Sequence, residues 1–302
     1  MATDGSSTIG RDRFALIALW GARLVWIALA VFGGAGIGSA LASHDRAVQL
    51  TGTIGAWIAW GVVALALLIP STLGLTVVRA VVPAALVAAA IAALEGDDAI
   101  ERLVCVGLAL LAAALVASGE LGQLFAQSSA YGDERRFVLR PPVAYLLPTV
   151  VSWCVLCAAA IAGPLLVASG AWAAGAPVSV AAVVLAWFLG RRYHRLARRW
   201  VVVVPAGIVI HDHLVLAETA MFPRTSLAHV ALALEGTEAA DLTGPAAGMA
   251  VEIALRDTPT VVLAATRNAP RGTALHVRSV LVAPTRPGRM LAEVARRGFP
   301  VG

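Results

Sequence analysis

The chain has 302 residues, of which 59% are hydrophobic and 14% charged, with a mean hydropathy of +0.83 and a formal net charge of +5. Soluble domains carry roughly 25% charged and 45–50% apolar residues, and a single soluble core stops growing near this chain length. The composition therefore excludes a soluble enzyme, a disordered chain and a small disulfide scaffold. It indicates a polytopic membrane protein.

Six segments are apolar over the roughly 20 residues that a helix needs to cross the hydrocarbon core of a bilayer. We expect spans at residues 23–42, 54–72, 77–94, 100–118, 143–169 and 172–190. Residues 14–22 either extend the first span or lie in the membrane interface. Together the spans predict a six-helix transmembrane domain over residues 1–190.

Arginines cluster on one side of these predicted spans. They lie before or at the start of the first span, at the start of the third, before the fifth and after the sixth. The residues are Arg11, Arg13, Arg23, Arg79, Arg135, Arg136, Arg140 and the run at 191–199. Because cytoplasmic loops carry the arginine excess, we expect a multi-pass protein of the cell membrane with both termini in the cytoplasm.

The positive charge of the whole chain lies in its C-terminal third. Residues 1–190 hold 9 Arg and 10 acidic residues, whereas residues 191–302 hold 14 Arg and 8 acidic residues. A basic segment next to a membrane is attracted to anionic lipid head groups. Nucleic acid is the competing partner for a basic domain, but no recognition motif supports it. We therefore predict membrane lipids as partners and no nucleic acid.

The sequence pattern changes at Trp200, where short runs with period-two alternation, broken by Pro, Gly and Asn, become typical of strands. We expect strands at 200–204, 207–211, 214–219, 226–234, 249–256, 260–265 and 274–282, with a loop at 237–247. Residues 287–297 are predicted to form one helix that begins at a Pro and ends before a Gly. A basic juxtamembrane linker over 191–199 thus precedes an all-β domain over 200–302.

Seven short strands closed by one C-terminal helix are the order of elements in a pleckstrin-homology (PH) sandwich. Residues 198–232, from Arg-Arg-Trp-Val-Val-Val-Val-Pro-Ala-Gly-Ile-Val-Ile-His-Asp to the later Phe222-Pro-Arg-Thr-Ser-Leu-Ala-His-Val230, resemble the opening of bacterial PH-like domains. The whole chain resembles uncharacterised multi-pass membrane proteins of actinobacteria that carry such a domain. The resemblance implies a PH-like C-terminal domain. It implies no binding residue, because PH folds bind phosphoinositides, proteins or no known ligand.

Two groups of residues are candidates for contact with lipid or with other helices. The basic run after the sixth span is predicted to continue that helix out of the membrane. Its arginines suit contact with lipid phosphates and also act as a topology determinant. The predicted head-group contacts are Arg191, Arg192, Arg195, Arg198 and Arg199. In the first span, Gly34 and Gly38 have the small-xxx-small spacing that lets helices pack closely, within the bundle or between protomers.

Two further motifs resemble binding or redox sites, and each has a simpler structural interpretation. His211-Asp212-His213 offers metal ligands, but a zinc site needs three or four. We prefer a polar turn in which Asp212 accepts backbone N–H groups. Cys154-Val-Leu-Cys157 has the spacing of a redox pair, but it lies in an apolar run where Cys usually packs as a small hydrophobe. We predict no catalytic, cofactor or metal site.

Charged residues within the predicted spans include Arg23, Arg79 and Glu101. Charges there are functional hypotheses by default, but each lies within about two turns of a helix end and can extend to the interface. The connection at 119–141 is long. It is either a segment that lies on the lipid surface or docks onto the C-terminal domain, or a stop-transfer flank, which we prefer.

These patterns favour a non-enzymatic integral membrane protein whose cytoplasmic PH-like domain binds the membrane surface or a protein partner. The alternative is a transporter of a small molecule or lipid with a regulatory cytoplasmic domain. A transporter would need a polar, water-accessible cavity between its helices.

Overall fold

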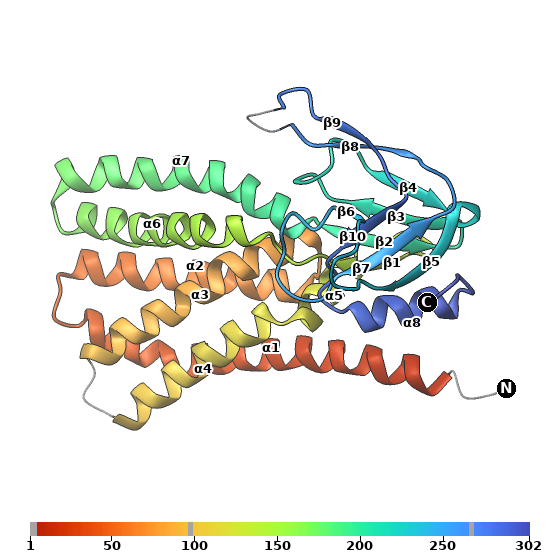
Figure 1. Ribbon diagram of the computed structural model, residues 1–302. Helices are drawn as coiled ribbons and strands as arrows, with labels where there is room; N and C mark the ends of the chain where they lie inside the picture. Colours follow the sequence, from red (N-terminus) through yellow and green to blue (C-terminus); the bar gives the residue numbers. More distant parts are fainter. Residues whose placement is uncertain (1–4, 96–98, 266–268) are drawn as a thin grey trace. The chain divides into compact units, whose positions relative to one another are not determined.

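The computed structural model describes residues 5–95, 99–265 and 269–302 (Figure 1). The chain divides into two compact units. One comprises the residues up to Phe125 together with Val150–Tyr193, and the other comprises Ala126–Thr149 together with His194–Gly302. The second unit is therefore built from two separate stretches of the sequence.

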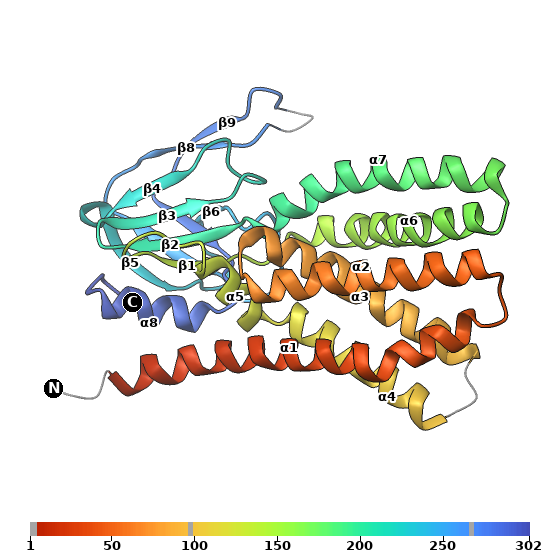
Figure 2. The same ribbon diagram turned by 180° about the vertical axis from the view of Figure 1, so that it is seen from behind.

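Among the described residues, six helices are long and apolar enough to cross a membrane, which confirms the predicted number. They are α1 (Gly5–Leu41), α2 (Arg46–Leu68), α3 (Thr72–Glu95), α4 (Ala99–Ala117), α6 (Val143–Ala168) and α7 (Trp172–Ala197), and a short α5 (Gly119–Gln127) follows α4. Residues 14–22 belong to α1, so they extend the first span. Figures 1 and 2 show the long helices running alongside one another.

Large apolar side chains cover the outer surface of these helices. Leu147, Val183 and Trp187, for example, are all more than 60% exposed. Contiguous apolar surface of this extent is not stable in water and marks contact with lipid or protein. The burial pattern therefore agrees with helices that face a bilayer.

Polar side chains fasten the helices together where they cross. The indole Nε1 of Trp26 on α1 donates to the carbonyl of Trp60 on α2 at 3.0 Å, and Trp60 Nε1 donates back to the carbonyl of Trp26 at 2.9 Å. Arg23 donates to Leu67 O at 2.9 and 3.1 Å and to Leu68 O at 3.3 Å. Since α2 ends at Leu68, Arg23 binds the unpaired carbonyls and the negative end of its helix dipole.

Two glycines allow α6 and α7 to pack very closely. A Cβ on Gly163 would lie 2.8 Å from the backbone N of Ser179, and a Cβ on Gly175 would lie 2.8 Å from Val167 Cγ2. A real side chain cannot be accommodated at such distances without movement of the backbone. Small residues at helix contacts are the usual device for close packing in membranes.

The second unit contains two four-stranded sheets, a hairpin and a final helix. The first sheet has the order β1-β2-β3-β4, antiparallel throughout, with β1 (Arg135–Val138), β2 (Trp200–Val204), β3 (Gly207–His211) and β4 (Ala220–Pro223). The second has the order β5-β7-β10-β6, with β5 (Leu227–Leu232), β7 (Val251–Leu255), β10 (Ser279–Val282) and β6 (Ala240–Asp241). The hairpin pairs β8 (Thr260–Leu263) with β9 (Thr273–His276), and the helix is α8 (Pro287–Arg296).

One hydrophobic core is shared by the two sheets and α8. Every second residue of β7 is buried, as the predicted alternation requires, and Met290 and Val294 on α8 point into the same core. Phe137 from β1 is 7% exposed and belongs to this core. The prediction of a β-rich C-terminal region closed by a helix is confirmed.

Four features of this unit differ from the prediction. β1 lies in the 119–141 connection, so the domain predicted to begin at 200 also needs residues from before α6. The strand predicted at 214–219 is a turn with one bridge at Leu216, and the strand begins at Ala220 instead. Residues 274–282 are split between β9 and β10, and the predicted loop at 237–247 contains β6, which pairs with β10 in parallel.

Candidate functional site

The second unit is connected to α6 and α7 through two neighbouring strands. β1 leads into α6, and α7 leads into β2. These strands pair antiparallel from Arg135 opposite Val203 to Val138 opposite Trp200. The helical hairpin α6–α7 is therefore inserted between two adjacent strands of one sheet, and the chain leaves and re-enters the sheet at the same end of these strands.

A buried ion pair fixes this connection. The Arg199 side chain is 1% exposed and that of Asp212 is fully buried. Arg199 Nε donates to Asp212 Oδ1 at 2.8 Å, and Arg199 Nη2 donates to Asp212 Oδ2 at 2.6 Å. This bidentate geometry is the strongest that a guanidinium and a carboxylate can adopt. Moving two charges out of water costs free energy, which is offset only when each charge has an oppositely charged partner and hydrogen bonds in the interior.

The same guanidinium also binds two backbone carbonyls from distant parts of the chain. Nη1 donates to Arg140 O at 2.7 Å, just before α6, and Nη2 approaches Thr243 O at 3.4 Å. We call this set, Arg199 and Asp212 with the carbonyls of Arg140 and Thr243, the junction clamp. Arg199 was predicted to contact lipid head groups. That prediction is wrong, because the side chain is buried in the clamp.

Asp212 has the role in a turn that the sequence predicts for it. Its Oδ1 also accepts the N–H of Leu214 at 3.1 Å, and its carbonyl accepts the N–H of Leu216 at 2.9 Å. The polar-turn interpretation of His211-Asp212-His213 is therefore confirmed. Among the residues that the structure describes, no three His, Cys, Asp or Glu side chains form a cluster that could hold a metal ion.

Backbone hydrogen bonds hold the chain that leads from β1 into α6. The N–H of Leu139 donates to Arg199 O at 3.0 Å, and the N–H of Arg140 donates to Ala283 O at 2.8 Å. At the first residue of the helix, the N–H of Val143 donates to Pro245 O at 3.2 Å. The entry of α6 is thus bound to the β-domain by three separate segments. Of the alternatives weighed for the 119–141 connection, docking onto the C-terminal domain is the one that the structure shows.

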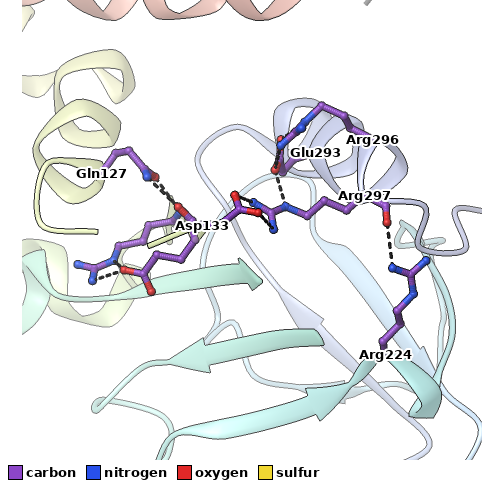
Figure 3. A network of polar contacts seen from close by, with 8 residues as sticks. Gln127, Asp133, Arg224, Glu293, Arg296 and Arg297 are labelled. Atoms are coloured by element: carbon purple, nitrogen blue, oxygen red, sulfur yellow. Dashed lines mark hydrogen bonds and ion pairs between the residues drawn. The ribbon is translucent and has the colours of Figure 1, made fainter. Parts of the chain in front are cut away.

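The exposed edge of β1 is covered by the side chain of Gln127 (Figure 3). Gln127 Nε2 donates to Glu134 O at 2.8 Å, and Gln127 Oε1 accepts the N–H of Arg136 at 3.0 Å. The amide therefore imitates the pairing of a further strand, which protects an edge that would otherwise offer free hydrogen-bonding groups.

A network of charged side chains links α8 to the loop before β1 (Figure 3). Glu293 Oε1 accepts from Arg296 and from Arg297, both at 2.6 Å, and Arg297 Nη2 donates to Asp133 Oδ1 at 2.8 Å. Arg224 binds the end of the helix by donating to Gly298 O at 2.7 Å. Burial alone would raise the pKa of Glu293, but the hydrogen bonds and charges of Arg296 and Arg297 outweigh burial and lower this pKa.

His211 lies in an aromatic and basic stack on the outer face of the first sheet. The His211 ring, on β3, stacks on the ring of Trp200, on β2, with centroids 5.2 Å apart. The guanidinium of Arg136, on β1, lies 5.0 Å from the centre of the Trp200 ring. Burial, followed by the charges of His213, Arg198 and Arg136, lowers the pKa of His211 to about 4. The imidazole is therefore neutral at physiological pH.

The other four arginines of the basic run are exposed. As predicted, α7 continues into this run and ends at Ala197, and the N–H of Arg198 donates to His194 O at 3.1 Å. Arg191, Arg195 and Arg198 are spaced by four and three residues, so they lie on one face of the helix. The exposed set, which we call the basic surface, consists of Arg191, Arg192, Arg195 and Arg198.

Arg191 lies at the point where α7 changes from apolar to basic. Its guanidinium stacks 3.5 Å from the ring centre of Trp187, and its Nη1 donates to the carbonyl of Trp187 at 3.4 Å. Trp187 is 64% exposed. A Trp next to an Arg at the end of an apolar helix is typical of the boundary between the acyl chains and the head groups.

The remaining predicted residues lie in the helices. Gly34 and Gly38 are exposed, and a Cβ on either would meet no atom of the described residues within 4 Å. Packing between protomers stays a prediction for them. Cys154 and Cys157 lie on α6 as free cysteines.

The intramembrane arginines bind the ends of neighbouring helices. Arg23 binds the last carbonyls of α2, as described above, and Arg79 Nε approaches Val116 O at 3.4 Å, one residue before α4 ends. This arrangement gives both arginines a structural role that the sequence alone does not indicate.

Comparison of the chain with protein-family models, with curated proteins and with solved structures found no match. The junction clamp is the part of the site that sequence reasoning missed. The available signal was the position of Asp212, an acidic residue in a run of apolar strand residues and 13 positions after an arginine.

Proposed function

We propose that the chain is a non-enzymatic integral membrane protein whose C-terminal unit is a PH-like β-domain that binds anionic head groups at the membrane surface. The basic surface would make this contact. The observation that carries the proposal is the difference in burial between the arginines of one run. Arg199 is buried in the junction clamp, whereas its four neighbours stay exposed at the end of a membrane-crossing helix.

The clamp supports the proposal because it buries only the last arginine of the run and joins the end of α7 to the start of α6. The exposed arginines follow Trp187 in the sequence, and Arg191 stacks on that ring. Each Arg near an anionic surface contributes roughly 1 kcal/mol of attraction. Four of them would favour anionic over zwitterionic surroundings by at most about 4 kcal/mol, which is large enough to measure.

The PH-like assignment rests on the order and packing of the elements. Two mainly antiparallel sheets share one large core, and a C-terminal helix packs against it. The segment 198–232 that resembles bacterial PH-like domains supplies β2, β3 and β4 of the first sheet and β5 of the second. A PH-like fold does not fix a ligand, so the choice of lipid comes from the basic surface and not from the fold.

We further propose that both termini lie in the cytoplasm of a cell-membrane protein, in line with the arginine distribution. Reporter fusions test this orientation. A fusion after Ser43 or after Gly170 should report an external position, and a fusion at the C-terminus an internal one. An external C-terminus would overturn the orientation.

The head-group contact is tested by native mass spectrometry of the purified full chain. A zwitterionic phosphatidylcholine and an anionic phosphatidylglycerol are added in equal amounts, and the lipids retained by the protein are counted. We expect the wild-type chain to retain phosphatidylglycerol preferentially and the variant R195Q/R198Q to lose much of this preference.

The matched control is R271Q/R278Q, which removes the same charge from two exposed arginines of the same unit. It should retain lipid like the wild type. Equal retention by all three proteins would overturn lipid recognition by the basic surface and favour a protein partner instead.

A further inference from the structure

An uncharged, exposed loop lies beside the β-domain's connection to α6. Residues 242–251 contain no charged side chain, although residues 191–302 carry 22. Within this stretch Pro245, Ala247, Gly248 and Met249 are exposed, and Met249 is 65% exposed. We call residues 244–249 the apolar loop. Exposed apolar surface of this kind often marks contact with a protein or a membrane.

The apolar loop is attached at three points to the first residue of α6 and to the residues just before it. The N–H of Val143 donates to Pro245 O at 3.2 Å. Gly244 packs on Pro142, whose Cγ would lie 3.1 Å from a Cβ at that position. Arg140 donates to the carbonyl of Met249, and its guanidinium fills the space where a side chain on Gly248 would stand. The loop therefore stays at the level of the α6 N-terminus.

The length of α6 determines how deep that level is. Its 26 residues extend over about 39 Å at about 1.5 Å per residue. A bilayer has a hydrocarbon core of about 30 Å and measures about 40–45 Å with its head groups. When α6 is centred on the core, Val143 lies about 4–5 Å outside the hydrocarbon, within the head-group layer.

The first turns of α6 have the surface expected at that depth. Val143 and Leu146 are about half exposed, Leu147 is 72% exposed, and the amphipathic Tyr145 lies among them. Tyr is enriched at the membrane interface, where its ring is buried and its hydroxyl stays hydrated. The start of α6, to which the loop is attached, thus exposes apolar side chains suited to the interfacial layer.

We propose that the apolar loop rests in the interfacial layer of the bilayer, with the Met249 side chain directed toward the acyl chains. The occupant of this surface is lipid, because the loop is fastened to a helix that crosses the membrane. The proposal depends on α6 as a membrane span and not on the binding of head groups by the basic surface. The loop carries no charge, so its contact does not require anionic lipid.

The test uses site-specific quenching in nanodiscs made of zwitterionic lipid alone. Met249→Cys and Met221→Cys are introduced into the full chain with Cys105, Cys154 and Cys157 changed to Ala, and each new thiol receives a fluorophore. Met221 lies on β4 and is 51% exposed, so it is a matched control of the same residue type. The quenchers are a lipid with a nitroxide near its head group and aqueous iodide.

We expect the lipid nitroxide to reduce emission at position 249 more than at position 221, and iodide to do the reverse. Equal quenching at both positions, or quenching at 249 by iodide alone, would overturn the proposal. Should the cysteine background fail to fold, the unaltered chain is labelled with a membrane-dissolved carbene precursor. Labelling of the Met249 peptide above the Met221 peptide supports the proposal, and equal labelling overturns it. These outcomes are independent of the proposed function, because a basic surface without a preference for anionic lipid would change neither the quenching nor the labelling at position 249.

Discussion

Replacing Asp212 by Leu should destabilise the β-domain more than almost any other single change. The substitution leaves the Arg199 guanidinium buried, with only the carbonyls of Arg140 and Thr243 as partners. Breaking a buried pair by removing one partner costs about 3–5 kcal/mol, because an uncompensated charge remains in the interior. We expect a loss of this size in the free energy of unfolding of the domain.

The loss is measured by hydrogen exchange at the backbone amides of β2 and β3 in the full chain in nanodiscs. The slowest amides of a core strand report the free energy of global opening. The double variant R199M/D212L removes both charges and should cost less than Asp212→Leu alone, even though it gives up the bonds to two carbonyls. The surface variant Asp257→Asn should stay within about 0.5 kcal/mol of the wild type.

A cost below about 1 kcal/mol for Asp212→Leu would refute this reasoning, since a desolvated pair cannot be broken so cheaply. So would additivity in the double variant. Two groups that share two hydrogen bonds must show a coupling energy when both are changed.

Three further predictions concern other parts of the chain. Phe137→Ala should destabilise the β-domain by about 3–5 kcal/mol by the same exchange measurement, because it opens a cavity in the shared core; no loss would show that β1 is not part of the domain. Gly163→Val should lower the thermal stability of the detergent-solubilised protein, whereas Gly61→Val, where a Cβ meets nothing within 4 Å, should not. The pKa of His211 is about 4 in the folded chain, and that of a His in the unfolded chain is about 6.5. As the pH falls, the unfolded chain therefore binds this proton first, so the free energy of unfolding should fall as the pH drops from about 6.5 to 4. His211→Gln should reduce that fall and the exposed His276→Gln should not; equal pH profiles would refute the assignment to His211.

The membrane helices could be predicted from the sequence because their signal is local. Each span is a run of apolar residues of about the required length, and no distant partner is needed to recognise it. The strands 200–204 and 207–211 were equally accessible, since two short apolar runs are joined by a two-residue turn. In each of these cases the sequence pattern and the stabilising contact lie in the same stretch of chain.

The parts that could not be predicted depend on contacts between distant residues. β1 has only four residues, and its partner strand lies beyond two membrane helices. Arg199 belongs to an arginine run whose other members are exposed, and only its distance to Asp212 distinguishes it. The strand at Ala220 begins later than predicted because Asp212 first binds the N–H of Leu214 and turns the chain. A fragment that starts at residue 200 would therefore lack both an edge strand and a partner of the clamp.

We propose above that the basic surface binds anionic lipid head groups at the membrane surface. The most direct test extracts the full chain from its native membrane in polymer-bounded lipid particles and measures the lipids that come with it by mass spectrometry. We predict that the wild-type particles are enriched in anionic lipid relative to the bulk membrane, and that R191Q/R192Q/R195Q/R198Q particles match the bulk composition. The same enrichment in both proteins, or none in the wild type, would contradict the account.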